Sequence, residues 1–185
     1  MEKKIKVLGI AGSLRKKSYN RALLRAALEV APSNCILEIL DLEGIPLYNQ
    51  DEENPLPQTV VRLKTKIRGA DAILIATPEY NYSISGVLKN ALDWGSRPYG
   101  ENAWDNKTVA IMGASPGLQG TSRAQYHLRQ VFVYLNMHPL NQPELMVGTA
   151  QDKFDDNGNL TDPKTHQKIA ALLNALIVAA KHRLV

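Results

Sequence analysis

The sequence predicts an α/β protein in which helices cover both faces of a doubly wound, five-stranded parallel sheet. Two observations lead to this fold class. Short apolar runs of strand length alternate along the chain with segments whose apolar residues repeat at helical spacing. Most of these runs are continuously apolar, as in parallel strands that are buried on both faces. The intervening helices supply the crossovers that parallel neighbours require.

Five segments are predicted to form the strands. Residues 5–11 (IKVLGIA) and 72–77 (AILIAT) have the clearest patterns, and Pro78 ends the second of them. The remaining strands are expected at residues 36–42, 108–112 and 144–147.

Five helices are expected between and after the strands, at residues 21–31, 59–68, 84–92, 123–136 and 169–180. The third has the cleanest stripe, because its apolar residues fall at i, i+3, i+4, i+7 and i+8. They are Ile84, Val87, Leu88, Ala91 and Leu92. The fourth helix has a predicted core face of Ala124, Leu128, Val131 and Leu135.

Length and composition limit the class of protein. A chain of 185 residues fits a single domain, residues 1–185, with a sizeable core. The net charge is +4, but the cations are scattered, which argues against a nucleic-acid partner. The apolar runs are too short to span a bilayer, so no membrane association is expected. The single cysteine, Cys35, and a start that does not resemble a signal peptide favour a cytoplasmic location.

Three loops are the expected place for a ligand. In an open parallel sheet, ligands bind beyond the carboxyl ends of the strands, at the switch point. This rule selects residues 12–20, 78–85 and 113–121. No metal site is expected, because the four histidines lack metal-ligand spacing.

The first loop, GSLRKKSYN at residues 12–20, suits a phosphate group. It lacks the glycines of a dinucleotide fingerprint and the G-K-[ST] of a P-loop. It offers instead Ser13, Ser18 and Asn20, together with the guanidinium of Arg15, at the N-terminus of a helix. A mononucleotide phosphate is the sharper interpretation. The alternative is that Ser18 or Asn20 only caps the helix and that the cations are solvated.

The second loop suits a flat heterocycle. Asn81 and neighbouring backbone amides can hydrogen-bond the edge of a ring, and Tyr80 and Tyr82 offer aromatic walls. Gly86 permits close approach at the start of the next helix. The alternative is that the two tyrosines only pack on the surface.

These motifs together resemble a known family. G-S-L-R-x-x-S-x-N after the first strand and P-E-Y-N-x-S-x-x-G-x-L-K-N-A-x-D-W after the third are similar to the NADPH-dependent FMN reductases, and most of all to bacterial quinone and chromate reductases. The third loop, G-A-S-P-G-x-x-G-T-S-R-A-Q-Y-H-L-R-Q, and L-Y-N-Q-D at residues 47–51 extend the likeness over residues 4–148. The resemblance implies a flavodoxin-like fold with strand order 2-1-3-4-5.

The resemblance also implies a set of cofactor-binding residues. The FMN phosphate would be bound at Ser13, Arg15, Ser18 and Asn20, with Leu14 and Tyr19 nearby in the cofactor site. The ribityl chain and ring edge would be bound at Pro78, Glu79, Tyr80 and Asn81, and the flavin or the nicotinamide at Ser115 and Gly117. NADPH or NADH would be the co-substrate, and no protein side chain would be catalytic because the cofactor carries the chemistry.

Family members are commonly dimers or tetramers, so a homodimer or homotetramer is expected. Large residues of the helix at 123–136 lie away from its predicted core face, and we expect them at a subunit contact. They are Tyr126, Phe132, Val133 and Tyr134. A polar network of Arg123, Tyr82, Tyr126 and Glu144 is expected at the same boundary.

The expected reaction is a ping-pong transfer of hydride from NAD(P)H to bound FMN, and then to small-molecule electron acceptors. Quinones, azo compounds, metal oxyanions such as chromate and free flavin are candidate acceptors. Lys16 and Lys17 either attract the extra phosphate of NADPH or are solvated. The alternative functions are a flavodoxin-type electron carrier, which Arg15 and the positive charge disfavour, a flavin-dependent sensor, and a dinucleotide-binding dehydrogenase.

Overall fold

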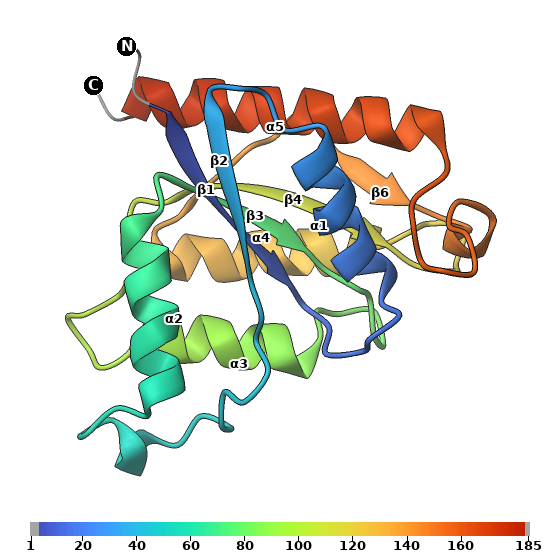
Figure 1. Cartoon of the computed structure of the whole chain (residues 1–185). Coiled ribbons are helices and arrows are strands. Elements are labelled where there is room, and N and C mark those ends of the chain that lie inside the picture. Colours follow the sequence, from blue (N-terminus) through green and yellow to red (C-terminus); the bar gives the residue numbers. More distant parts are fainter. Residues whose placement is uncertain (1–3, 184–185) are drawn as a thin grey trace.

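The computed structural model describes residues 4–183 and contains one parallel sheet. Its strands are β1 (Ile5–Ala11), β2 (Cys35–Leu40), β3 (Ala72–Ala76), β4 (Thr108–Ala114), β5 (His138–Pro139) and β6 (Leu145–Val147). The order is β2-β1-β3-β4-β5, and β6 also pairs with β4 (Figure 1). The predicted flavodoxin-like order 2-1-3-4-5 is therefore confirmed.

The fifth position of the sheet is divided between two short strands. β5 pairs with Thr108 and Val109 at the start of β4, whereas β6 pairs with the last three residues of β4. Only β6 was predicted from the sequence, because a two-residue strand has no periodic pattern. Between β5 and β6, side chains of the neighbouring helix bind the backbone. Arg129 donates to the carbonyl of Leu140 at 2.8 Å, and Gln125 donates to that of Leu145 at 3.0 Å.

The helices are α1 (Tyr19–Glu29), α2 (Gln58–Gly69), α3 (Gly86–Gly95), α4 (Ser122–Leu135) and α5 (Pro163–Arg183), with short 3₁₀ turns at Gln50–Glu52 and Ala150–Asp152. α1 and α5 cover one face of the sheet, and α2, α3 and α4 cover the other (Figure 1). Among residues 4–183 no helix is both long enough and apolar enough to cross a membrane.

The two faces of the sheet each contribute to a separate hydrophobic cluster. Along β3, Leu74 points into the cluster under α1 and α5, whereas Ile73 and Ile75 point into the cluster above α2, α3 and α4. All five residues of β3 are buried. This two-sided burial explains why the central strands read as uninterrupted apolar runs.

The starts of α2 and α4 differ from the prediction by one residue, whereas those of α1, α3 and α5 differ by two or more, and capping explains where these three helices begin. α1 begins at Tyr19 because the Ser18 hydroxyl accepts hydrogen bonds from the next backbone N–H groups. α3 begins at Gly86 because Ser85 caps it, so Ile84 precedes the helix. α5 begins six residues earlier than expected, at Pro163, where the Asp162 carboxylate accepts from Thr165. Its polar first turns have no apolar pattern from which to predict them.

The assignment of Phe132 to an exposed face was wrong. Its side chain is fully buried in the cluster above α2, α3 and α4. Phe132 follows Leu128 by four residues, so both lie on the same face of α4. Tyr126, Val133 and Tyr134 are exposed, with 59%, 81% and 75% of their surface accessible.

Candidate active site

Three loops at the carboxyl edge of the sheet enclose a cavity of about 320 Å³. They follow β1, β3 and β4, the positions that the sequence selected. Nine of the twelve predicted cofactor residues line this cavity, with Ala114 and Pro116. The nine are Ser13, Arg15, Ser18, Tyr19, Asn20, Pro78, Glu79, Tyr80 and Ser115.

A second cavity of about 430 Å³ adjoins the first and shares Glu79 and Ser115 with it. It contains two more of the predicted residues, Asn81 and Gly117. Its lining also contains Tyr82, which the sequence suggested as an aromatic wall, and Arg123, which the sequence placed in a subunit-boundary network. The sequence prediction did not include Leu118, Gln119 and Gly120 as ligand-binding residues. Leu14, the twelfth residue, lines neither cavity and is 48% exposed.

The first loop packs closely against the second. A Cβ atom on Gly12 would lie 3.2 Å from Pro78 and from Leu88, which is tighter than ordinary van der Waals contact. The Ser85 hydroxyl donates to the Gly12 carbonyl at 2.6 Å. Glycine at this position therefore allows the two loops to meet at the base of the cavity.

Asn20 joins the first loop to the end of β4. Its side-chain oxygen accepts from the Ala114 N–H at 2.9 Å, and its side-chain nitrogen donates to the Ala114 carbonyl at 3.0 Å. The residue is 3% exposed. Both polar groups of the amide are thus engaged with backbone, as in a strand-to-strand pair, and fix the distance between the first and third loops.

Arg15 presents its charge to solvent beside the first cavity. The side chain is exposed and forms no ion pair within residues 4–183. Its guanidinium carbon lies 5.5 Å from the centre of the Tyr19 ring. Ser13 is buried, and its hydroxyl accepts from the Arg15 N–H at 3.3 Å. This region combines a cation, hydroxyl groups and a helix N-terminus.

The second loop has a tightly folded backbone. Tyr80 and Ser83 exchange backbone hydrogen bonds of 3.0 and 2.9 Å. Asn81 and Tyr82 lie between them with φ of 51° and 65°, in the left-handed region. The Tyr80 and Tyr82 rings are mostly exposed. The turn therefore holds their backbone groups in one fixed arrangement at the mouth of the cavities.

Glu79 fastens the second loop to α4. Its carboxylate, 10% exposed, accepts from the Ala124 N–H at 3.0 Å and from the Arg123 guanidinium at 3.2 Å. Arg123 also lies over the Tyr82 ring, with its guanidinium carbon 4.1 Å from the ring centre. Arg123 and Tyr82, two members of the predicted polar network, thus contact each other within one chain.

Ser115, on the third loop, is held by backbone and side-chain bonds. Its N–H donates to the Val147 carbonyl at 3.0 Å, and its hydroxyl donates to the Gly120 carbonyl at 2.5 Å. The hydrogen bond to Val147 therefore fixes the position of the third loop relative to β6. Because Ser115 lines the second cavity, the divided edge of the sheet helps to shape that cavity.

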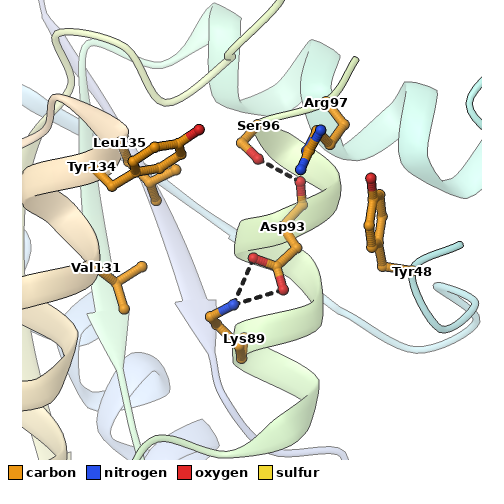
Figure 2. Close-up of a pocket in the computed structure, with 8 residues that line it drawn as sticks. All are labelled: Tyr48, Lys89, Asp93, Ser96, Arg97, Val131, Tyr134 and Leu135. Carbon is orange, nitrogen blue, oxygen red and sulfur yellow. Dashed lines mark hydrogen bonds and ion pairs between the residues drawn. The ribbon is translucent and has the colours of Figure 1, made fainter. Parts of the chain in front are cut away.

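A further cavity of about 450 Å³ lies between α3 and α4, away from the three loops. Figure 2 shows Lys89 paired with Asp93 and the rings of Tyr48 and Tyr134 facing the space from opposite sides. Tyr48 donates to Glu53 at 2.7 Å, and this hydrogen bond raises the pKa of its phenol. This cavity contains none of the predicted cofactor residues.

A family model described as NADPH-dependent FMN reductase matches residues 5–152. The chain belongs to this family. An NAD(P)H-dependent FMN reductase of Pseudomonas aeruginosa is 53% identical over 177 residues, covering 95% of each chain. A 2-hydroxy-1,4-benzoquinone reductase of Burkholderia sp is 42% identical over 170 residues, covering 92% of this chain and 93% of that one.

A solved structure agrees with this membership. The flavoenzyme FerB of Paracoccus denitrificans, an NAD(P)H:(acceptor) oxidoreductase, superposes with a TM-score of 0.88 at 34% identity. The alignment covers 97% of this chain and 98% of that one. The protein is accordingly an oxidoreductase that uses FMN as cofactor and NAD(P)H as co-substrate.

The residues present fit such a cofactor. A mononucleotide has an anionic phosphate at one end and a flat ring at the other. The two adjoining cavities offer different surroundings that match these two ends. The first has Arg15 and the N-terminus of α1, which favour a phosphate. The second is open, and the ring of Tyr82 lies at its edge.

Proposed function

We propose that the protein is an FMN-dependent NAD(P)H oxidoreductase that reduces quinones by a ping-pong mechanism. One observation carries this proposal: the predicted phosphate and ring residues line two adjoining cavities that share Glu79 and Ser115. Azo compounds, metal oxyanions such as chromate, and free flavin are further acceptors to be tested. The relatives named for quinone reduction support quinones as the first choice.

The first cavity is the proposed phosphate site. Ser13, Ser18 and Tyr19 line it together with Arg15. Because the Ser18 oxygen accepts the capping hydrogen bonds, its own O–H remains able to donate to a phosphate oxygen. The forked guanidinium of Arg15 adds charge-assisted bonds that suit a terminal phosphate. Asn20 contributes as the residue that sets the width of this site, because its amide is engaged with Ala114.

The second cavity is the proposed site of ring binding and of electron transfer. The ring edge would be held by backbone groups of Glu79 and Asn81, which line this cavity, and of Pro78 and Tyr80, which line the adjoining first cavity. Ser115 and Gly117 would face the ring or the nicotinamide. The chemistry that FMN supplies when bound is the acceptance of a hydride from NAD(P)H and its return to an acceptor. The protein orients both partners and admits them one after the other.

The competing function is that of a flavodoxin-type electron carrier without nicotinamide-dependent reductase activity. Arg15 in the phosphate loop and the net charge of +4 favour the reductase. The two functions differ in whether NAD(P)H alone reduces the protein.

We further propose that the enzyme is a homodimer or homotetramer and is cytoplasmic. Tyr126, Val133 and Tyr134 of α4 are exposed, and Tyr134 also lines the α3–α4 cavity of Figure 2. A second copy seated on α4 would cover these side chains. The single cysteine suits a reducing compartment. Light scattering of the wild-type protein and of Tyr126→Ser tests the assembly. A monomeric mass for the wild type would contradict it.

The visible spectrum of the purified protein tests the main proposal. We expect bound flavin, bleaching on anaerobic addition of NADPH or NADH, and recovery of colour when a benzoquinone is added. Double-reciprocal plots of the initial rate against the NAD(P)H concentration, measured at several quinone concentrations, should give the parallel lines of a ping-pong mechanism. A protein that fails to take up FMN at micromolar concentration would overturn the proposal. A protein that binds FMN without bleaching would be a carrier.

A further inference from the structure

Phe154 lies outside every motif considered so far, in the segment between β6 and α5. It is 8% exposed, and the segment is closed by a bridge between Phe154 and Leu160. Figure 1 places this segment at the same end of the molecule as the loop that precedes α1. Phe154 lies beyond residues 5–152, which the family model matches, and does not line either cavity of the candidate active site.

The Phe154 ring packs against Tyr19, the first residue of α1. The two ring centres are 4.9 Å apart, and the planes are inclined by 39°. Such tilted aromatic pairs are favourable beyond the surface that they bury. The guanidinium carbon of Arg15 also lies over the Tyr19 ring, 5.5 Å from its centre. Phe154, Tyr19 and Arg15 therefore form a continuous row that ends at the first cavity.

The segment that carries Phe154 is itself firmly attached to α1. Arg25, two turns along the helix from Tyr19, donates to the Gly158 carbonyl at 2.8 Å. Within the segment, the Asp155 carboxylate accepts from the Asn159 N–H at 2.7 Å, and Gly158 has φ of 78°. Phe154 is thus held in place independently of its contact with Tyr19.

An exposed arginine loses considerable side-chain freedom when it grips a ligand. A ring that already limits the positions of the guanidinium reduces this loss, and the affinity for the ligand rises accordingly. Tyr19 can serve in this way only if its own ring is held, and the contact with Phe154 holds it. The benefit applies to the anionic group that Arg15 binds, and not to the remainder of the ligand.

We propose that Phe154 is a positioning residue for phosphate recognition, acting through Tyr19 on Arg15. The proposal rests on the proposed function, because the phosphate is that of FMN. It assigns a part in cofactor binding to a segment distant in sequence from all three active-site loops.

FMN and riboflavin differ only by the phosphate, so the ratio of their dissociation constants isolates phosphate recognition. Both constants are measured by flavin fluorescence quenching for the apoprotein of the wild type and of Phe154→Leu, which keeps an apolar side chain but removes the ring. We expect Phe154→Leu to weaken FMN about three- to tenfold and to change riboflavin less than about twofold. Leu160→Val is the matched control in the same segment. It should lower the melting temperature slightly and leave the ratio unchanged.

Two further comparisons test the route through Tyr19 and Arg15. Tyr19→Phe should retain the wild-type ratio of the FMN to the riboflavin dissociation constant, whereas Tyr19→Leu should raise it as Phe154→Leu does. In an Arg15→Ala background, Phe154→Leu should have no further effect on the ratio.

Equal weakening of FMN and riboflavin by Phe154→Leu would overturn the proposal, since it would indicate a merely structural role. So would an undiminished effect of Phe154→Leu in the Arg15→Ala background. If the wild-type apoprotein bound neither flavin, the proposed function itself would fail, and that result is distinguishable from the others.

Discussion

The loop after β1 and the loop after β3 are attached to the rest of the protein in different ways. The first is anchored at its start by the hydrogen bond from Ser85 to the Gly12 carbonyl and at its end by the Ser18 cap and the Asn20 amide, and its middle residues, 14–17, are exposed. The second is fastened along its length, by Glu79 to α4, by the Tyr80–Ser83 bridge and by a 2.7 Å hydrogen bond between Ser83 and His127. The exposed first loop presents the Arg15 charge to a phosphate, whereas a flat ring requires fixed backbone groups. Stability and affinity should therefore respond differently in the two loops.

The largest effect is expected at the anchor of the first loop. Asn20→Leu leaves the buried N–H and carbonyl of Ala114 without partners, and the free energy of unfolding should fall by about 2–4 kcal/mol. Urea unfolding of the apoprotein measures this change. Lys17→Ala, in the exposed middle of the same loop, is the control and should stay within about 0.5 kcal/mol of the wild type. A stable Asn20→Leu protein would show that the anchor is dispensable.

Arg15→Ala should change affinity and leave stability alone. We expect FMN to bind about 10- to 100-fold more weakly, because a hydrogen-bonded charge on the phosphate is lost, while urea unfolding of the apoprotein is unaffected. Isothermal titration with FMN and with riboflavin measures the effect. Arg62→Ala, an exposed arginine on α2 that lines neither cavity, is the matched control. An equal loss of both flavins would contradict the assignment of Arg15 to the phosphate.

Glu79→Ala, unlike Arg15→Ala, should lower the stability of the protein. It removes two hydrogen bonds between the second loop and α4 and should lower the free energy of unfolding by about 1–2 kcal/mol. Glu79→Gln retains an acceptor for the Ala124 N–H and should recover about half of the loss. Urea unfolding of the three apoproteins provides the comparison. If both variants matched the wild type, the second loop would not depend on its attachment to α4.

The smallest effect is expected for Lys16→Ala combined with Lys17→Ala. Both side chains are exposed at the mouth of the first loop. If they attract the extra phosphate of NADPH, the ratio of kcat/KM for NADPH over NADH should fall about two- to fivefold at low salt. Steady-state kinetics at two ionic strengths measures it. An unchanged ratio would assign the two lysines to solvated surface.

The sequence predicted most of the fold because the central strands are covered on both sides. Burial of Ile73, Leu74 and Ile75 leaves no polar position in the pattern, and such runs are easily recognised. The strand order came from the family resemblance, since periodicity does not specify neighbours. The division of the last strand escaped prediction because His138 and Pro139 pair with β4 without any pattern of their own.

The candidate site was predicted as a set of residues rather than as a set of contacts. Eleven of the twelve residues line two adjoining cavities, because loops that follow neighbouring parallel strands meet at one edge. Sequence could not distinguish a ligand contact from an internal one. Asn20 illustrates this limit, since its partner Ala114 is 94 residues away and is bound through backbone atoms. The packing of Phe154 on Tyr19 carries no motif at all.

The gap between β5 and β6 has a practical consequence for engineering the enzyme. Residues 141 and 142 are exposed there, and on either side of them α4 is hydrogen-bonded to the backbone, by Arg129 at Leu140 and by Gln125 at Leu145. Extra residues inserted at this point would extend into solvent without shifting the register of β6. A short affinity tag or a fluorophore site can therefore be inserted at residues 141 and 142, and both binding cavities should keep their shape.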